Sequence, residues 1–136
     1  MQRATSLFFA TTSTFAAAAC AIAILVVGSR SSLAAGDPEA GQQVFTRCGV
    51  CHATDPGVNK IGPSLAGVVG RKSGTASGYD YSPAMKNANI TWDNDTLDKF
   101  LAGPGSFVHG TKMFLSVTNS ADRQNVIAYL DTLKSP

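Results

Sequence analysis

The sequence predicts an all-α domain preceded by an apolar leader. Apolar residues recur with helical spacing in several segments, and capping residues such as Asp37, Ser82 and Asp93 stand where those segments begin. No segment has the pattern of a convincing strand. The chain has 136 residues, which is a length expected for a single domain.

The first predicted helix runs from about residue 37 to residue 49. Asp37 is its N-cap and Pro38 occupies its first position. One face of this helix carries Gly41 and Phe45. A glycine on that face predicts a close helix crossing, for which the last helix of the chain is the natural partner.

Two short helices are predicted in the middle of the chain. The first spans residues 65–69. The second follows Ser82 as its N-cap and has Pro83 at its first position. Residues 70–78, which are rich in Gly, Ser and Thr, form the loop between them.

Two longer helices follow. One begins after its N-cap Asp93 and runs to about Ala102, where Gly103-Pro104-Gly105 ends it. Residues 103–118 then show no helical or strand period. The last helix has Ser120 as its N-cap. Its apolar stripe consists of Val126, Ile127, Leu130 and Leu133.

Residues 1–35 have the layout of a secretory signal peptide. A positive charge near the start is followed by apolar, alanine-rich residues 8–27 and then by small residues. We expect cleavage after Ala35, although cleavage after Ala34 also fits, and release of a domain of residues 36–136 into the periplasm. The alternative is an uncleaved membrane anchor, because the apolar stretch approaches spanning length.

The side chains of the processed chain carry no net charge. The leader contains Arg3 and Arg30 and no acid, so its removal leaves nine basic and nine acidic residues. On charge grounds, neither nucleic acid nor a membrane surface is therefore expected as a partner. No stable membrane insertion is expected once the leader has been removed.

The most specific motif is Cys48-Gly49-Val50-Cys51-His52. Two thiols three residues apart, with a histidine directly after the second, form the attachment pattern of a c-type haem. In a helical stretch both sulfurs share a face and can add to two vinyl groups on one haem edge, while the imidazole binds the iron. The adjacent histidine argues against a thioredoxin-type dithiol, and a disulfide across two residues is strained. A zinc site needs a second cysteine pair, and only Cys20 remains.

The iron of such a haem has one further axial position. Met113 lies in the segment without helical period, which can fold over the face opposite His52. Met85 lies inside a short helix, where a role in the core is expected. His109 and several lysines are the other candidates. An iron with His and Met ligands has no open position for a substrate or oxygen.

Other residues are suited to support a haem. Pro63 has no backbone N–H, but its carbonyl can accept a hydrogen bond from an iron-bound histidine. Arg71, Tyr79, Tyr81 and Trp92 carry donors that can bond a buried propionate. The alternatives are an ordinary Gly-Pro turn and ordinary half-buried aromatic residues.

These motifs resemble those of a class I c-type cytochrome of the mitochondrial and α-proteobacterial type. The resemblance covers nearly the whole processed domain. It is carried by Cys48-x-x-Cys51-His52, Gly62-Pro63-x-Leu65, Gly70-Arg71-Lys72-x-Gly74, Tyr81, Ile90-Thr91-Trp92, Gly110-Thr111-Lys112-Met113 and Ile127-Ala128-Tyr129-Leu130.

The resemblance implies a cytochrome c fold, with three main helices and short helices around one covalently bound haem and with the first and last helices crossing. It implies a haem c attached through Cys48 and Cys51. It implies His52 and Met113 as the axial ligands of the iron, with Pro63 accepting a hydrogen bond from His52. The residues that it implies near the propionates are Arg71, Tyr81, Trp92 and Thr111.

The function implied is one-electron transfer by a monomeric, soluble carrier that is not an enzyme. Its partners would be redox proteins, with a quinol-oxidising complex as donor and a terminal oxidase or photosynthetic reaction centre as acceptor. One competing hypothesis is a haem enzyme or gas sensor, which needs a vacant or labile sixth iron position. Another is the same carrier tethered to the membrane by its leader.

Four features depart from the family pattern. His109 replaces a proline; it is expected at the surface, and the alternative is that His109 or Lys112 replaces Met113 at altered pH. Phe100 stands where the family usually has a tyrosine whose hydroxyl reaches the methionine sulfur. Met85 stands where asparagine is common, and both changes predict a drier pocket. The lysines around the haem edge are fewer, which predicts weak salt dependence of partner encounters.

Overall fold

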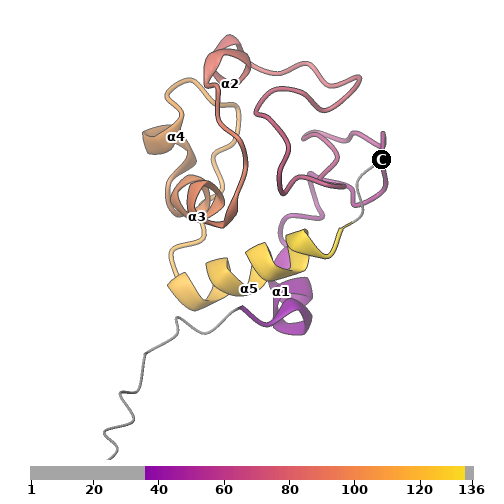
Figure 1. Ribbon diagram of the computed structural model, residues 1–136, viewed down its shortest axis with the longest axis vertical. Helices are drawn as coiled ribbons and strands as arrows, with labels where there is room; N and C mark the ends of the chain where they lie inside the picture. Colours follow the sequence, from indigo (N-terminus) through magenta and orange to yellow (C-terminus); the bar gives the residue numbers. More distant parts are fainter. Residues whose placement is uncertain (1–35, 134–136) are drawn as a thin grey trace, which may run out of the picture. The chain divides into compact units, whose positions relative to one another are not determined.

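The computed structural model describes residues 36–133. Its helices are α1 (Pro38–Phe45), α2 (Pro83–Asn87), α3 (Asn94–Ala102), α4 (Pro104–Phe107) and α5 (Ser120–Asp131) (Figure 1). The described residues contain no strand, only an isolated antiparallel bridge between Lys72 and Thr91. The all-α prediction is therefore confirmed. The predicted leader, residues 1–35, lies outside the described residues.

Helices α1 and α5 cross each other (Figure 1). Where they cross, there is no room for a side chain at Gly41 of α1. A Cβ atom on Gly41 would lie 2.0 Å from the backbone oxygen of Asn125. Asp37 caps α1 by accepting a hydrogen bond from the Glu39 N–H at 2.9 Å. The Asp37 N–H in turn donates to the Asn125 side chain at 2.9 Å. The predicted crossing of the first and last main helices is confirmed.

The residue before this cap also packs directly on α5. A Cβ atom on Gly36 would lie 2.0 Å from the backbone oxygen of Gln124. Real Cβ atoms do not approach an oxygen so closely, so the contact requires glycine at position 36.

A capping box begins α3, as the sequence predicted for its N-cap. The Asp93 carboxylate accepts from the Thr96 N–H at 2.8 Å, and the Thr96 hydroxyl accepts from the Asp93 N–H at 2.8 Å. The prediction of no helix in residues 103–118 is wrong over α4. Gly103 ends α3, and Pro104, whose fixed φ suits a first helical turn, begins another helix.

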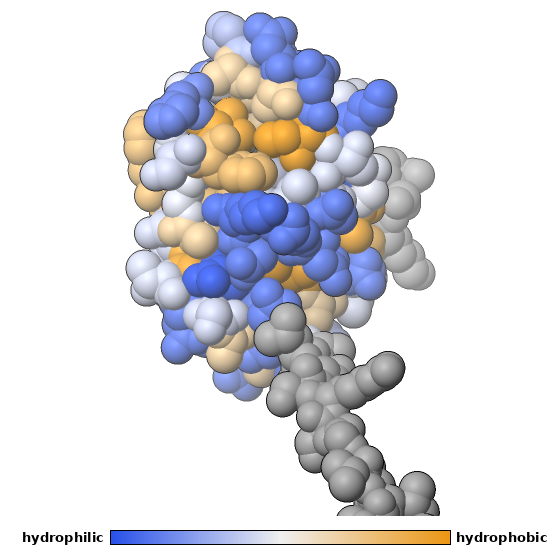
Figure 2. All heavy atoms as spheres, turned by 60° about the vertical axis from the view of Figure 1, so that its left-hand side comes forward, coloured by the Kyte–Doolittle hydropathy of each residue, from blue (hydrophilic) through white to orange (hydrophobic). Residues whose placement is uncertain are grey.

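The face seen in Figure 2, on the side that carries α3 and α4, bears a band of hydrophilic side chains below a group of apolar ones.

Two other predictions need correction. Residues 65–69 form successive turns instead of a helix, because Gly67 and Gly70 adopt φ angles of 59° and 85°. The N-cap of α5 is Asn119, not Ser120, and its side chain accepts a hydrogen bond from the first turn of the helix. Both residue types are good caps, and here the extended backbone belongs to Asn119.

The core lies around α5, which packs against α1 and against α3, and around the loops that connect these helices. Val126 and Ile127 of α5 are each 1% exposed, and Leu130 is also buried, which confirms the predicted apolar stripe at these three positions. The fourth, Leu133, is partly buried and lies beyond the end of the helix. Phe45 of α1 packs against Tyr129 of α5, with ring centroids 5.2 Å apart. Among the helices of residues 36–133, none combines the length and apolar character needed to cross a membrane.

Candidate functional site

After α1 the chain continues in tight turns that bring two thiols to one cavity. Helix α1 ends at Phe45, earlier than predicted, but helix-like hydrogen bonds continue beyond it. The Gly49 N–H donates to the Phe45 carbonyl at 2.8 Å, and the His52 N–H donates to the Cys48 carbonyl at 2.9 Å. Cys48 is buried, Cys51 is half-buried, the two form no disulfide with each other, and both line the cavity. Burial raises the pKa of the Cys48 thiol, so this sulfur keeps its proton at neutral pH.

One hydrogen bond fixes the imidazole of His52. Its Nδ1 lies 2.7 Å from the carbonyl oxygen of Pro63. Because a carbonyl can only accept, Nδ1 carries the proton and Nε2 keeps a free electron pair. Burial lowers the pKa of His52 and outweighs the hydrogen bond to Pro63, which acts in the opposite direction. The ring is therefore neutral, as a metal ligand must be.

Gly62 allows this ring to approach the backbone. A Cβ atom on Gly62 would lie 2.4 Å from Cε1 and 2.7 Å from Nδ1 of His52. The Gly62 N–H also donates to the Cys51 carbonyl at 2.8 Å, which ties the loop to the cysteine segment. The sequence motif contained Gly62, but this role was not predicted. The contact joins two segments that only the folded loop brings together.

These groups face a cavity of about 550 Å³. Its wall is mostly apolar, which suits a large aromatic cofactor. The cavity is lined by Phe45, Cys48, Cys51, His52, Ile61, Gly62, Pro63, Leu65, Val68, Arg71, Tyr79, Tyr81, Ser82, Met85, Trp92, Leu97, Phe100, Leu101, Thr111, Lys112, Met113, Phe114, Leu115, Val126 and Leu130. All nine residues predicted for the site are among them.

Met113 reaches the cavity from the segment between α4 and α5. Its side chain is half-buried, and its N–H donates to the Thr111 hydroxyl at 3.3 Å. The Thr111 N–H donates to the Val108 carbonyl at 3.0 Å, which connects this segment to the end of α4. The structure therefore brings Met113 and His52 to the same cavity from opposite halves of the chain.

Arg71 provides the test of whether the cavity suits a group with carboxylates. Its guanidinium donates to the Ala66 carbonyl and to the Ser64 carbonyl, each at 3.0 Å. Its Nε is buried and has no hydrogen-bond partner among the described residues. A buried cationic donor without a partner is unfavourable, and a haem propionate would supply that partner. The residues present therefore fit a haem.

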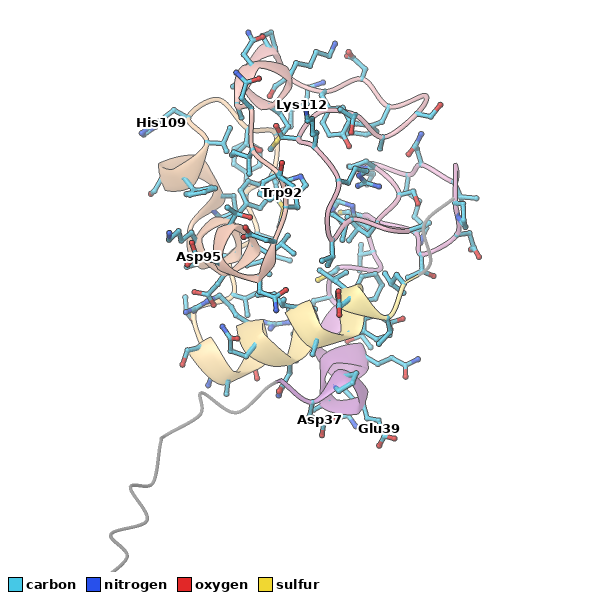
Figure 3. The ribbon with its side chains drawn as sticks, viewed as in Figure 1. Asp37, Glu39, Trp92, Asp95, His109 and Lys112 are labelled. Atoms are coloured by element: carbon cyan, nitrogen blue, oxygen red, sulfur yellow. The ribbon has the colours of Figure 1, made fainter. Side chains whose placement is uncertain are left out.

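The aromatic residues of the site have different roles. The Tyr79 hydroxyl donates to the Ile61 carbonyl at 2.8 Å, so Tyr79 is bonded to the backbone of the cavity rim. Burial raises the pKa of Tyr81, so its hydroxyl is a donor at neutral pH. Trp92 is 7% exposed and lies in the interior (Figure 3), where it packs against Phe100 with ring centroids 5.0 Å apart.

Phe100 and Met85, which depart from the family pattern, are both buried and both line the cavity. Neither side chain carries an N–H or O–H donor. These two positions therefore contribute no hydrogen-bond donor to the cavity, in keeping with the predicted drier pocket.

The two alternative ligands lie in different surroundings. His109 is exposed, is not part of the cavity wall, and points away from the molecule in Figure 3. Lys112 reaches the cavity rim, but its Nζ donates to the Asp80 carbonyl at 2.8 Å and lies 3.4 Å from the Asp80 carboxylate. Hydrogen bonds from Lys86 and Lys112 lower the pKa of Asp80, so this carboxylate stays charged at neutral pH.

Three exposed apolar side chains line the cavity mouth and were not predicted. Ile61 is 77% exposed, Phe114 is 91% exposed and Leu115 is 43% exposed. Each lies within two residues of a predicted motif, which was the one signal in the sequence that could have identified them.

The chain matches the protein-family model described as Cytochrome c over residues 38–134. It is 50% identical over 103 residues to cytochrome c2 of Rhodoblastus acidophilus, covering 74% of this chain and 96% of that one. It is 48% identical over 119 residues to cytochrome c2 of Rhodomicrobium vannielii, covering 82% and 95% of the two chains. Its fold is similar to that of cytochrome cH from Methylobacterium extorquens, with a TM-score of 0.68, 42% identity, and 71% and 99% of the two chains covered.

Proposed function

Because the chain belongs to the cytochrome c family, we propose a residue-by-residue assignment of its haem site. The protein is a monohaem electron carrier with a covalently bound haem c. Cys48 and Cys51 each add a thiol S–H across one vinyl group, which forms two thioether bonds. The His52 Nε2 atom and the Met113 sulfur are the axial ligands of the iron.

The hydrogen bond from His52 to Pro63 is the observation that carries this assignment. It places the proton on Nδ1 and leaves Nε2 for the iron. Cys48, Cys51 and Met113 line the same cavity as this ring, which supports their grouping in one site. Two ligands from the chain leave no open iron position for a substrate, so the protein passes on electrons instead of transforming a substrate.

We assign Arg71, Tyr81, Trp92 and Thr111 to the propionates. The buried, unpartnered Nε of Arg71 and the protonated hydroxyl of Tyr81 support this part of the proposal. When bound, the haem iron supplies the one-electron step between Fe(III) and Fe(II). The chain's own residues exclude water, hold the ring and balance the charge of its carboxylates.

We assign the processed domain, residues 36–136, to the periplasm as a soluble monomer. It accepts electrons from a quinol-oxidising complex and delivers them to a terminal oxidase or a photosynthetic reaction centre. The signal-peptide layout of residues 1–35 supports this setting. Mass spectrometry of the native protein tests it. A chain that begins at Gly36 and carries one haem is expected, whereas a chain that keeps its leader would mean a membrane-anchored carrier.

The axial assignment is tested with two matched methionine variants, because Met113 and Met85 both line the cavity. The ferric wild-type protein should show the weak red-edge absorption band that comes from sulfur-to-iron charge transfer. We expect Met113→Leu to lose this band and Met85→Leu to keep it. The opposite pattern would assign the sixth ligand to Met85, and a wild type without the band would remove both methionines.

Carbon monoxide separates the carrier from a haem enzyme or gas sensor. The reduced wild-type protein should not bind it, because Met113 occupies the second axial position. The reduced Met113→Leu variant should bind it, which serves as the positive control. Rapid binding by the wild type would favour the enzyme or sensor.

A further inference from the structure

The segment that carries Met113 makes few hydrogen bonds of its own. Residues 113–116 form what we call the strap, which runs along the cavity mouth between α4 and α5. Within the described part of the chain, residues 114–116 make no hydrogen bond, and Phe114 is 91% exposed. Among residues 36–133, the only hydrogen bond of the strap is that of Met113 to Thr111. The position of Met113 therefore depends on what holds the two ends of the strap.

The far end of the strap is held by a buried residue whose N–H and carbonyl are both hydrogen-bonded. Val117 is 2% exposed, and its N–H donates to the Leu101 carbonyl of α3 at 2.8 Å. Its carbonyl accepts from Nη1 of Arg123 at 3.0 Å, and the Thr118 carbonyl accepts from the same nitrogen at 2.9 Å. One guanidinium on α5 thus binds two successive carbonyls directly after the strap.

Arg123 is itself fixed by an acid on α3. Its Nε donates to Oδ1 of Asp98 at 2.8 Å, and the two side chains are 13% and 29% exposed. Gln124 donates to the same oxygen at 3.0 Å. Helix α3 also supplies Phe100 and Leu101 to the cavity wall. The Asp98–Arg123 pair therefore connects the cavity wall, α5 and the strap.

The near end of the strap is held less firmly. Lys112 donates to the Asp80 carbonyl at 2.8 Å and pairs with the Asp80 carboxylate at 3.4 Å, but the two side chains are 54% and 87% exposed. Solvent-exposed ion pairs contribute little to stability, whereas a partly buried guanidinium with several charge-assisted hydrogen bonds contributes more. The Arg123 end is therefore the stronger anchor.

We propose that Arg123 and Asp98 are positioning residues that hold Met113 at the cavity through the strap. They thereby set how strongly the sixth iron position resists a competing ligand. This inference rests on the proposed ligation of the iron by Met113. Neither residue lines the cavity, so each acts through the backbone of residues 117 and 118 and not by contact with the haem.

The test is a titration of the ferric holoprotein with imidazole, which must displace Met113 to bind. Arg123→Gln removes the anchor, and Asp98→Asn weakens it. We expect imidazole affinity to rise by about tenfold in Arg123→Gln and by a smaller factor in Asp98→Asn. If Arg123→Gln does not fold, Asp98→Asn alone decides, with at least about a twofold gain expected.

The controls are matched in chemistry and in location. Lys99→Gln and Asp95→Asn remove one positive and one negative charge in the same way from an exposed ion pair of α3, which has no hydrogen bond to the strap among the described residues. Gly41→Ala lowers overall stability at the α1–α5 crossing instead. We expect all three controls to bind imidazole as the wild type does. Unchanged affinity in the Arg123 and Asp98 variants, or an equal gain in the controls, would overturn the proposal.

The charge-transfer band separates this inference from the axial assignment. A wild type without the band refutes ligation by Met113, and the anchoring role is then refuted with it. A wild type that shows the band, together with Arg123 and Asp98 variants of unchanged imidazole affinity, refutes the anchoring role alone.

Discussion

Phe100 places an aromatic ring without a donor in the wall of the haem cavity. Its ring packs between Trp92 and Phe107, with centroids 5.0 Å and 6.5 Å away. A tyrosine at this position would add one hydroxyl to an otherwise apolar part of the wall. Hydrogen bonds to a metal ligand are among the means by which a protein adjusts a redox potential.

We predict that Phe100→Tyr raises the reduction potential, on the order of a few tens of millivolts. A hydroxyl that donates to the Met113 sulfur withdraws electron density from it, and the sulfur then stabilises Fe(III) less. Redox titration of the holoprotein measures the change. Phe107→Tyr is the matched control, because Phe107 is not part of the cavity wall. An equal shift in both variants, or no shift in Phe100→Tyr, would contradict the prediction.

The residues of the site differ in how far the sequence could identify them. Cys48, Cys51 and His52 are adjacent in the chain, so their spacing alone indicated their chemistry. The roles of Gly62 and Arg123 depend on contacts across loops and between helices, which no local pattern records. Gly62 lies against His52, which is 10 residues away in the chain, and Arg123 is held by Asp98, which is on another helix.

At the level of elements, the α1–α5 crossing depends on the absence of a side chain at Gly41. We predict that Gly41→Ala destabilises the holoprotein by about 1–3 kcal/mol, because the added methyl group meets the Asn125 carbonyl. Chemical denaturation measures the change. Gly105→Ala in α4 is the control, since a Cβ there has nothing within 4 Å. Gly105→Ala should leave stability unchanged or slightly higher.

The capping box of α3 predicts that the stability of the fold depends on pH. Hydrogen bonds from Thr96 lower the pKa of Asp93 in the folded state. Its carboxylate therefore stabilises the fold fully at a pH above the unfolded-state pKa of about 3.9. This stabilisation is lost as the pH falls through the lower pKa of the folded state. Asn can still cap but does not titrate. The stability advantage of the wild type over Asp93→Asn should therefore shrink below about pH 4. Denaturant midpoints across that range test it, and a constant difference would contradict it.

Helix boundaries could be predicted where one local signal dominates. Ser82 was identified as a cap because Pro83, directly after it, marks the first helical position. At α5 two good caps are adjacent, and the sequence could not decide between them. At α4 the Gly-Pro-Gly run indicated only a stop, although a proline suits a helix start equally well.

At the level of the whole molecule, residues 36–136 carry nine basic and nine acidic side chains, and several of the acids are already paired. Asp80 contacts both Lys86 and Lys112 beside the cavity rim. Two cations near the mouth therefore share one acid. The field that an approaching partner meets is weaker than the number of lysines would indicate.

We predict weak salt dependence for electron transfer to a partner with an acidic surface. The oxidation rate should fall less than about threefold between low and physiological ionic strength. Asp80→Asn should increase the salt dependence, because it leaves Lys86 and Lys112 without their acid. Stopped-flow oxidation at several salt concentrations measures both. A steep fall in the wild-type rate would refute the prediction.

The contact of Gly36 with α5 has a practical consequence for producing this protein. A leader exchanged for that of another host, or a tag removed by a protease, leaves its last cut close to this position. If the residues left by such a cut replace Gly36, they place a side chain against the Gln124 carbonyl. The Cβ atom of that side chain would lie 2.0 Å from the carbonyl oxygen. The clash would disturb α5, the helix that also carries Arg123. A recombinant product should therefore begin with its native glycine or keep that glycine after the added residues.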